Sequence, residues 1–129
     1  YVTGGIGSFY HGETFSKPYD LPNAEAYTET CAGIGLMFFA NAMLALENNA
    51  EYADVIERVL YNGVLSGMSL DGRSFFYENP LEITLRDHIT NIWGKKRYPI
   101  TQRLVGKVFL CFLVSLKNPY VGLNYFTNY

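Results

Sequence analysis

A carboxylate and a thiol one residue apart, Glu29 and Cys31, lie at the start of a long apolar run. On an α-helix, positions i and i+2 point about 200° apart, so both side chains can face one ligand only where the backbone is extended or turns just before the helix. Carboxylate oxygen and thiolate sulfur both bind zinc, which normally takes four ligands. The pair leaves two interpretations open: part of a zinc site, or a buried structural cysteine beside a surface glutamate.

A second candidate for chemistry is Glu13, in the stretch HGETF, a glycine-rich loop between aromatic residues. Partial burial there would raise the pKa of its carboxyl group toward the range of a general acid. His11 in the same stretch is interpreted as a surface histidine. The nearby GGIG lacks the spacing of a dinucleotide-binding loop and the Lys-Ser/Thr of a P-loop, so phosphate binding is not expected.

Two helices are expected to position these residues. The run from Ala32 to Glu47 is apolar almost all round, which is typical of a helix enclosed by other helices, and Thr28 or Thr30 is expected to cap its start. Asn48 and Glu51 have capping-box-like spacing ahead of a one-sided helix that ends near Gly63 to Gly67. The apolar stripe of this second helix comprises Tyr52, Val55, Ile56, Val59 and Leu60. An inner helix joined to an outer amphipathic one is the repeating unit of helical bundles and toroids.

The segments around the helix pair read as loop and hairpin. Residues 1–23 are rich in glycine, proline and aromatics without a helical period. The stretch MSLDGRSFFYENPLEI predicts a β-hairpin with its turn at Asp71-Gly72, ended by Pro80. The residues beyond it show no clean period.

Composition narrows the class of partner. The chain has 129 residues, 49% of them apolar, which is the length of one domain or of a piece of a larger one. A net charge of -2 gives no footprint for nucleic acid or an anionic membrane, and the longest apolar run falls short of the roughly 20 residues that span a bilayer. Two cysteines are too few for a disulfide framework. Because the chain begins at Tyr1 without an initiator Met or a signal-like segment, we expect an interior piece of a longer protein.

Three stretches, in order and with matching spacing, carry a resemblance to a known family: YVTGGIGS, HGETFSKPYDLPNAEAYTETCAGIGLMFFANAML and YADVIERVLYNGVLSGMSLDGRSFFYENPLE. They resemble glycoside hydrolase family 127, the bacterial β-L-arabinofuranosidases, in the later part of the catalytic domain. The resemblance implies that residues 1–129 are a partial catalytic domain in which residues 1–87 match the family. The implied fold is mainly α, a segment of an (α/α)6 toroid with a β-hairpin insertion.

The resemblance also implies site residues and a cofactor. The family binds zinc through one Glu and three Cys, one of which is the nucleophile of a retaining mechanism. Carried over, Glu29 and Cys31 are zinc ligands and Glu13 is the general acid/base. The implied substrate is an arabinose-containing oligosaccharide or glycan of plant type, with terminal β-L-arabinofuranose, and localisation stays open between bacterial cytoplasm and periplasm. Aromatics near Glu13 and on the hairpin are candidates for lining a sugar pocket: Phe9, Tyr10, Phe15, Tyr19, Tyr27 and Phe75 to Tyr77.

The sequence departs from the family downstream of the hairpin. The family has a CxCCPPN motif there, and this chain reads KVFLCFLVSLKNPYVG. With Cys111 on the first cysteine of the motif, Leu113 and Val114 occupy the nucleophile and the adjacent ligand position. If Cys111 is instead aligned with the nucleophile, one ligand is still missing.

The charge distribution changes in the same part of the chain. All twelve acidic residues lie between Glu13 and Asp87, and the residues after Asp87 carry six basic side chains. We therefore hypothesise that residues from about 106 to 129 are read in a shifted frame. Translating the coding DNA in its other two frames tests this hypothesis. If a CCPPN-like string is absent from both of those frames, the hypothesis is refuted.

Three interpretations follow. The first is a fragment of a zinc-dependent β-L-arabinofuranosidase, the second a non-catalytic remnant or sugar-binding helical fragment, and the third an unrelated helical interaction domain. Whether this polypeptide is itself an enzyme is left open by the missing cysteine pair. An isolated helix pair exposes its inner helix, so association or poor solubility is also expected.

Overall fold

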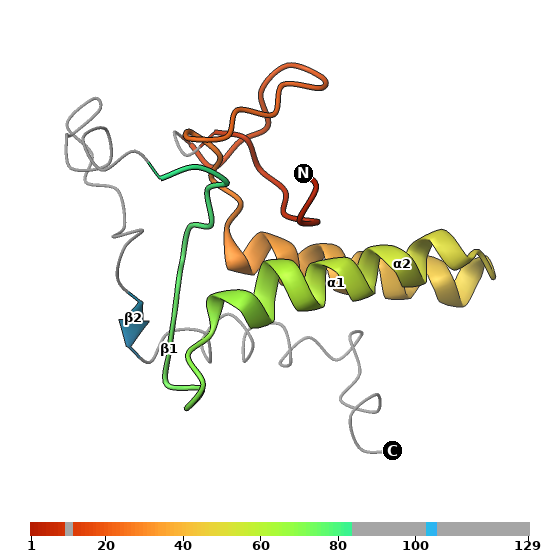
Figure 1. The fold of residues 1–129 in the computed structure, drawn as a ribbon. Coiled ribbons are helices and arrows are strands. Elements are labelled where there is room, and N and C mark those ends of the chain that lie inside the picture. The colour runs from red at the N-terminus through yellow and green to blue at the C-terminus, as the bar shows by residue number, and fades with distance from the viewer. Residues whose placement is uncertain (10–11, 84–102, 106–129) are drawn as a thin grey trace.

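Two helices lying side by side form the centre of the structure, a computed structural model that describes residues 1–9, 12–83 and 103–105 (Figure 1). Helix α1 spans Thr30–Leu46 and helix α2 spans Ala50–Val59. A π-helical turn, Leu60–Val64, and a 3₁₀ turn, Leu65–Gly67, continue α2. The described chain is therefore mainly helical, and its second helical segment ends at Gly67, within the range that the sequence predicts.

The cap of α2 lies one residue later than the sequence predicts. The spacing of Asn48 and Glu51 favours Asn48, but the side chain of Asn49 accepts the hydrogen bond from the Glu51 backbone N–H at 3.0 Å. Asn49 has an extended backbone and directly precedes the first helical residue, Ala50, which is the position where a side-chain oxygen can reach the free N–H groups.

The core lies where α2 faces α1. Ile34, Val59 and Val64 are buried together, and Val59 has no exposed surface. The predicted apolar stripe of α2 is confirmed, because its residues are buried or half-buried while the neighbouring Ala53, Asp54, Glu57 and Arg58 are exposed. Burial of this stripe supplies the hydrophobic contribution that holds the two helices together.

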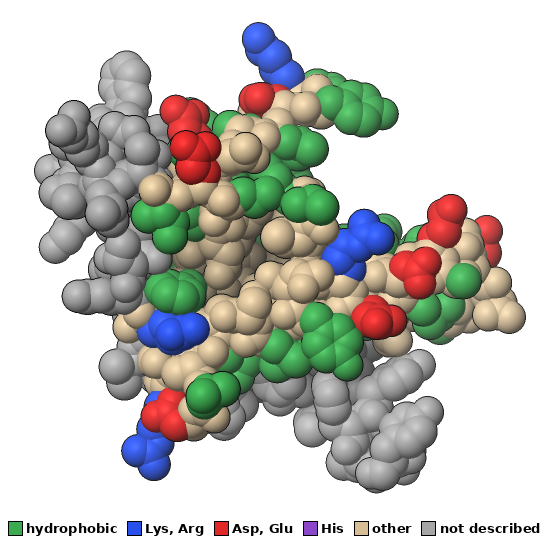
Figure 2. All heavy atoms as spheres, viewed as in Figure 1, with side chains coloured by type: hydrophobic (Ala, Val, Ile, Leu, Met, Phe, Trp, Pro, Cys, Tyr) green, Lys and Arg blue, Asp and Glu red, His purple; other side chains and the backbone are tan. Residues whose placement is uncertain are grey.

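Helix α1 is covered on one side by the described residues. Phe39 is 60% exposed and Leu46 is 83% exposed, and Figure 2 shows hydrophobic side chains at the surface of the helix pair. A helix that is apolar all round needs neighbours on every side, and α2 is a single neighbour. Neither helix of the described part is long and apolar enough to cross a membrane.

The segment after the helices turns where the sequence predicts. Gly72 has a φ of +68° and its N–H donates to the Ser69 carbonyl at 2.9 Å, while an isolated bridge joins Met68 to Phe75. The arm before the turn also contacts the arm after it, because the Ser69 N–H donates to the Ser74 carbonyl at 2.8 Å and the Phe76 N–H donates to the Gly67 carbonyl at 3.0 Å. Strand β1, Ser74–Phe75, forms its ladder with strand β2, Leu104–Val105, in antiparallel register. The two-stranded hairpin itself stays a prediction.

Residues 77–81 run beside residues 23–30, and this pairing places the site. The Thr30 N–H donates to the Tyr77 carbonyl at 3.0 Å, and the Asn79 N–H donates to the Tyr27 carbonyl at 3.3 Å. The Leu81 N–H donates to the Asn23 carbonyl at 3.0 Å. The segment that follows the turn therefore lies against the entry to α1, where Glu29 and Cys31 lie.

Candidate functional site

Glu29 is the N-cap residue of α1 and Cys31 lies in the first turn of that helix. The Glu29 backbone is extended, with φ -61° and ψ 137°. This is the backbone geometry that two side chains at i and i+2 need in order to face one ligand. The Glu29 side chain makes no capping hydrogen bond, so its carboxylate is directed to other partners.

The sequence predicts that Thr28 or Thr30 caps the start of α1, and this prediction is wrong. The Thr28 hydroxyl donates to the Asn79 carbonyl, and the Thr30 hydroxyl donates to the Phe76 carbonyl at 2.7 Å. Both threonines are buried, and buried hydroxyls need partners, which the adjacent 76–79 segment supplies. The threonines therefore tie the helix entry to the segment beside it.

Thr28 has a strained backbone. Its φ is +35°, in a region that β-branched residues rarely adopt, and holding a residue there costs on the order of 1–3 kcal/mol. Such a conformation persists only where the surrounding contacts over-determine it. The Thr28 N–H donates to the Gly7 carbonyl at 2.9 Å, and the Thr28 carbonyl accepts from the Asn79 side-chain amide at 3.0 Å.

Tyr27 connects Glu29 with Glu13. Its side chain is buried, and its hydroxyl donates to Oε1 of Glu13 at 3.2 Å. The rings of Tyr27 and Tyr77 meet edge to face with centroids 6.3 Å apart. The structure thus brings two of the predicted site residues, sixteen positions apart in the sequence, to the same pair of tyrosines.

Glu13 itself lies on an exposed loop, which contradicts its predicted partial burial. Every residue from Gly12 to Asp20 is exposed. The loop is closed by a bridge between Phe9 and Thr14, and Glu13 has a φ of +53°. In the described part of the chain the loop around Glu13 is exposed, and the Tyr27 hydroxyl donates to the Glu13 carboxylate.

The pKa values of Glu29, Tyr27 and Tyr77 depend on one another and on the charge of Glu13. Burial raises the pKa of the Glu29 carboxyl above its ordinary value, while hydrogen bonds from Tyr77 and Tyr27 oppose the shift and the charge of Glu13 adds to it. Burial also raises the pKa of Tyr27, with the charge of Glu29 adding to the effect. The pKa of Tyr77 is raised by burial and by its hydrogen bond to Glu29. Both phenols therefore stay protonated at neutral pH and act as donors to the carboxylates.

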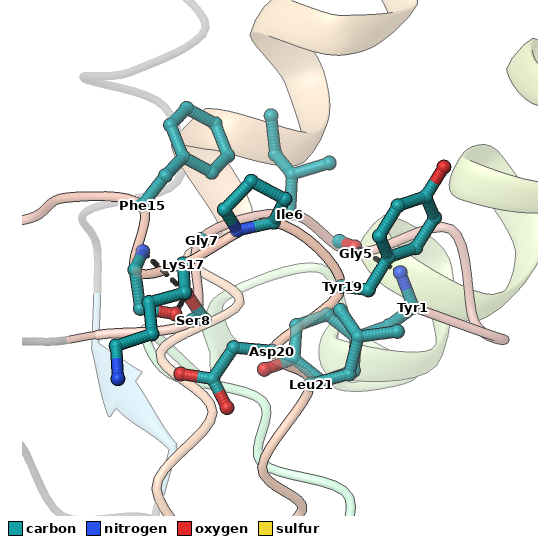
Figure 3. A pocket seen from close by; sticks show the side chains of 12 residues that line it. Tyr1, Gly5, Ile6, Gly7, Ser8, Phe15, Lys17, Tyr19, Asp20 and Leu21 are labelled. Atoms are coloured by element: carbon teal, nitrogen blue, oxygen red, sulfur yellow. Dashed lines mark hydrogen bonds between the residues drawn. The ribbon is translucent and has the colours of Figure 1, made fainter.

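Two cavities flank this cluster. One, of about 250 Å³, is lined by Glu29 together with Thr28, Asn79 and Glu78. The other, of about 350 Å³, lies in the glycine-rich N-terminal loops, and Figure 3 shows Phe15 and Tyr19 on opposite sides of Ile6 within it. Glu13 does not line either one, although Phe15 and Ser16 of its loop line the second.

The aromatic residues predicted to line a sugar pocket separate into groups. Phe15 and Tyr19 line the cavity of Figure 3, and Tyr27 and Tyr77 contact the carboxylates. Phe75 belongs to the core, with 1% of its surface exposed. Tyr10 lies outside the described residues, as does His11.

The described residues include two side chains that could serve as zinc ligands. Glu29 offers a half-buried carboxylate, and Cys31 follows it in the first helical turn. A cysteine binds a metal as the thiolate, so this role requires Cys31 in its reduced form. No group of three or more potential ligands occurs within residues 1–9, 12–83 and 103–105, and Cys111 lies outside them.

Two residues of the site are not visible from the sequence. Asn79 makes side-chain hydrogen bonds to Thr28 and Thr30, and Glu78 is buried with 2% exposure beside the same cavity. The only local signal is an Asn-Pro pair that ends the predicted hairpin. Their roles depend on contacts with residues about fifty positions earlier, which no local pattern reveals.

Comparisons with known proteins agree on one family. Residues 1–101 match the family described as the β-L-arabinofuranosidase catalytic domain of glycoside hydrolase family 127. The non-reducing end β-L-arabinofuranosidase of Bifidobacterium longum subsp. longum is 54% identical over 84 residues, which cover 65% of this chain and 13% of that protein.

Solved structures give the same result. The family 127 β-L-arabinofuranosidase Ara127N from Geobacillus stearothermophilus T6 is similar with a TM-score of 0.67 and 54% identity, over 70% of this chain and 14% of that one. Another family 127 β-arabinofuranosidase gives a TM-score of 0.61 and 56% identity, over 63% of this chain and 13% of that one. The chain thus spans about an eighth of the length of these relatives, and it belongs to the catalytic-domain family of the family 127 β-L-arabinofuranosidases.

Proposed function

We propose that this chain supplies the general acid/base and two zinc ligands of a retaining β-L-arabinofuranosidase that removes terminal β-L-arabinofuranose from plant-type glycans. The observation that carries the proposal is the hydrogen bond of Tyr27 to Glu13 at 3.2 Å, from a tyrosine whose ionisation is also coupled to Glu29. The Bifidobacterium relative is a non-reducing end β-L-arabinofuranosidase, which supports a non-reducing terminal sugar as the substrate.

Glu13 is the acid/base in this proposal. Its carboxyl group protonates the departing glycosidic oxygen and then, as a carboxylate, takes a proton from the water that releases the product. The Tyr27 hydroxyl orients the carboxylate by donating to Oε1. Exposure of the loop leaves the other face of Glu13 accessible to a substrate.

Glu29 and reduced Cys31 are the residues that would hold zinc. The bound ion would keep a coordinated thiolate deprotonated at neutral pH, as a cysteine nucleophile requires. Tyr77 donates to the Glu29 carboxylate and so helps to fix its orientation, while the single hydroxyl hydrogen of Tyr27 is donated to Glu13. The remaining ligands and the nucleophile are not among the described residues.

The (α/α)6 toroid belongs to the same proposal. Helix α1 is apolar all round, yet it has the exposed residues Phe39 and Leu46 on the side away from α2. Further helix pairs of a toroid would cover that side and remove this apolar surface from water. The turn at Asp71-Gly72 would then begin the β-hairpin insertion.

A second candidate function is a non-catalytic remnant that keeps the helical fold without turnover. It is favoured by Leu113 and Val114, which stand at the family's cysteine pair in the first alignment.

A transplant separates the two functions. The 84 matched residues of this chain replace the corresponding segment of the Bifidobacterium enzyme, which keeps the rest of its own chain. Under the proposed function the transplant hydrolyses a chromogenic β-L-arabinofuranoside, and Glu13→Gln, Glu29→Gln and Cys31→Ser each abolish most of the activity. Glu25→Gln, at an exposed acid on the same approach to the helix, is the matched control and keeps the activity.

A folded transplant without turnover would favour the remnant, since the segment itself would then have lost the geometry. Equal activity in the Glu13→Gln and Glu25→Gln forms would show that Glu13 is not the acid/base. Circular dichroism of each form establishes that the transplant is folded before its activity is compared.

A further inference from the structure

We propose that Asn79 is a positioning residue for Glu29: its side-chain amide clamps Thr28 and Thr30 and so fixes the carboxylate between them. The inference rests on the proposed function, in which Glu29 is a metal ligand. It concerns a residue that touches neither Glu29 nor the sugar directly in the described contacts, and that acts through the two threonines.

Both hydrogens of the Asn79 amide are used. Nδ2 donates to the Thr28 carbonyl at 3.0 Å and to Oγ1 of Thr30 at 3.0 Å. An amide nitrogen has two donors, so the group is saturated by the two residues that flank Glu29. The Asn79 backbone adds an N–H donated to Tyr27 at 3.3 Å and a carbonyl that accepts from the Thr28 hydroxyl.

These hydrogen bonds hold Thr28 in a backbone conformation that threonine rarely adopts. Thr28 has a φ of +35°, and glycine is the residue that usually takes positive φ values. Gly5 packs so closely that a Cβ atom placed on it would lie 3.0 Å from Cβ of Thr28. Hydrogen bonds from one side and steric contact from the other therefore leave Thr28 a single conformation, and the direction of Glu29 follows from it.

The same residues line one cavity. Asn79, Thr28 and Glu29 all line the space of about 250 Å³ beside the helix entry. Partners that hold a ligand in orientation commonly matter for metal affinity nearly as much as the ligand itself, and removing one weakens affinity about 10- to 100-fold. Asn79 is placed to have this effect because it sets the backbone on both sides of the ligand.

The test compares Asn79→Asp with Asn62→Asp in the full chain. Aspartate keeps the shape of asparagine but cannot donate, so it faces the Thr28 carbonyl with a negative charge. Asn62 lines the same cavity, is exposed and adds the same charge. Amide hydrogen exchange is followed by NMR at Thr28 and Thr30, whose N–H groups donate to Gly7 and Tyr77.

The expected result for Asn79→Asp is exchange roughly tenfold faster or more at Thr28 and Thr30, with no change in α2. Asn62→Asp leaves these rates unchanged. Zinc binding to the transplanted enzyme under reducing conditions, measured by competition with a chelator, weakens about 10- to 100-fold in Asn79→Asp alone.

Unchanged exchange at Thr28 and Thr30, or an equal increase throughout α2, would overturn the inference. A local increase in exchange, together with a transplanted enzyme that holds no zinc, would support the clamp and refute the metal role of Glu29, so the two failures are distinguishable. If Asn79→Asp does not fold, Thr30→Val removes one arm of the clamp, and faster exchange confined to residues 28–30 is then the supporting result.

Discussion

The Glu29 turn, residues 27–31, and the Glu13 loop, residues 12–20, hold their acids in opposite ways. In the turn, Thr28 and Thr30 are buried, and Glu29 is half-buried between them. In the loop every residue is exposed. The turn is fixed by hydrogen bonds to a segment about fifty residues later, whereas the Glu13 carboxylate accepts a hydrogen bond from the Tyr27 hydroxyl on an otherwise exposed loop.

The difference corresponds to the two proposed roles. A metal ligand must be held in one orientation, because coordination geometry tolerates little displacement. An acid/base must reach the leaving group and then a water molecule, which favours an accessible carboxyl group with a single orienting contact. Stability and function should therefore respond differently to changes in the two regions.

The largest expected effect is on catalysis from the Glu13 loop. In the transplanted enzyme, Glu13→Gln should lower turnover about 10²- to 10⁴-fold for a poor leaving group, because no group protonates the departing oxygen. The loss should shrink for a nitrophenol leaving group that departs without protonation. Rates with a series of aryl arabinofuranosides measure this dependence, and an equal loss for every leaving group would contradict the acid/base role.

Next in size is a steric change beneath the Glu29 turn. Gly5→Ala should destabilise the chain by about 1–3 kcal/mol, because its Cβ would lie 3.0 Å from Thr28, which cannot move without straining the turn. Gly35→Ala is the matched control, since nothing lies within 4 Å of its Cβ position and alanine favours the helix by about 0.5–1 kcal/mol. Urea unfolding of both variants measures the contrast, and equal stabilities would mean that the turn yields.

The pH dependence of stability offers a finer comparison. Burial raises the folded-state pKa of Glu29, so the folded chain binds this proton more tightly than the unfolded chain. The protonated Glu29 carboxyl therefore contributes to the free energy of unfolding. This contribution is fully present below the pKa of Glu29 in the unfolded chain, about 4.5, and is lost as the pH rises through its pKa in the folded chain. In the metal-free chain, Glu29→Gln should remove this decline, and unfolding free energies from pH 4 to 7 test it against Glu25→Gln.

The smallest effect is expected from the aromatic residues of the Glu13 loop. Phe15 is 74% exposed and Tyr19 is 99% exposed, so replacing either with alanine should change the free energy of unfolding by less than about 0.5 kcal/mol. Urea unfolding at one pH is sufficient. A loss of several times that size would show that the loop is packed, and would remove the contrast with the Glu29 turn.

The sequence predicts what depends on local pattern. The apolar stripe from Tyr52 to Leu60 is confirmed because a period of 3.6 residues is visible within one segment. The family membership also follows from contiguous stretches, and the extended backbone found at Glu29 meets the condition that the sequence sets for Glu29 and Cys31 to share a ligand. The cap at Asn49 rather than Asn48 shows the usual limit, since a one-residue boundary depends on local backbone geometry.

What the sequence misses depends on pairing between distant segments. The roles of Asn79 and the buried Glu78 require residues 77–81 to lie beside residues 23–30. The exposure of Glu13 was mispredicted because aromatic neighbours in a sequence need not pack over a loop. Thr28 and Thr30 were predicted as caps from their residue type, but tertiary contacts took their hydroxyls.

Zinc content of the transplanted enzyme tests the central assignment most directly. Metal per folded molecule is measured by mass spectrometry for the parent form, Glu29→Gln, Cys31→Ser and Glu13→Gln, all purified under reducing conditions. The proposed roles predict one zinc in the parent and in Glu13→Gln, and a marked loss in the other two. Full zinc occupancy in Glu29→Gln and Cys31→Ser would contradict their assignment as ligands.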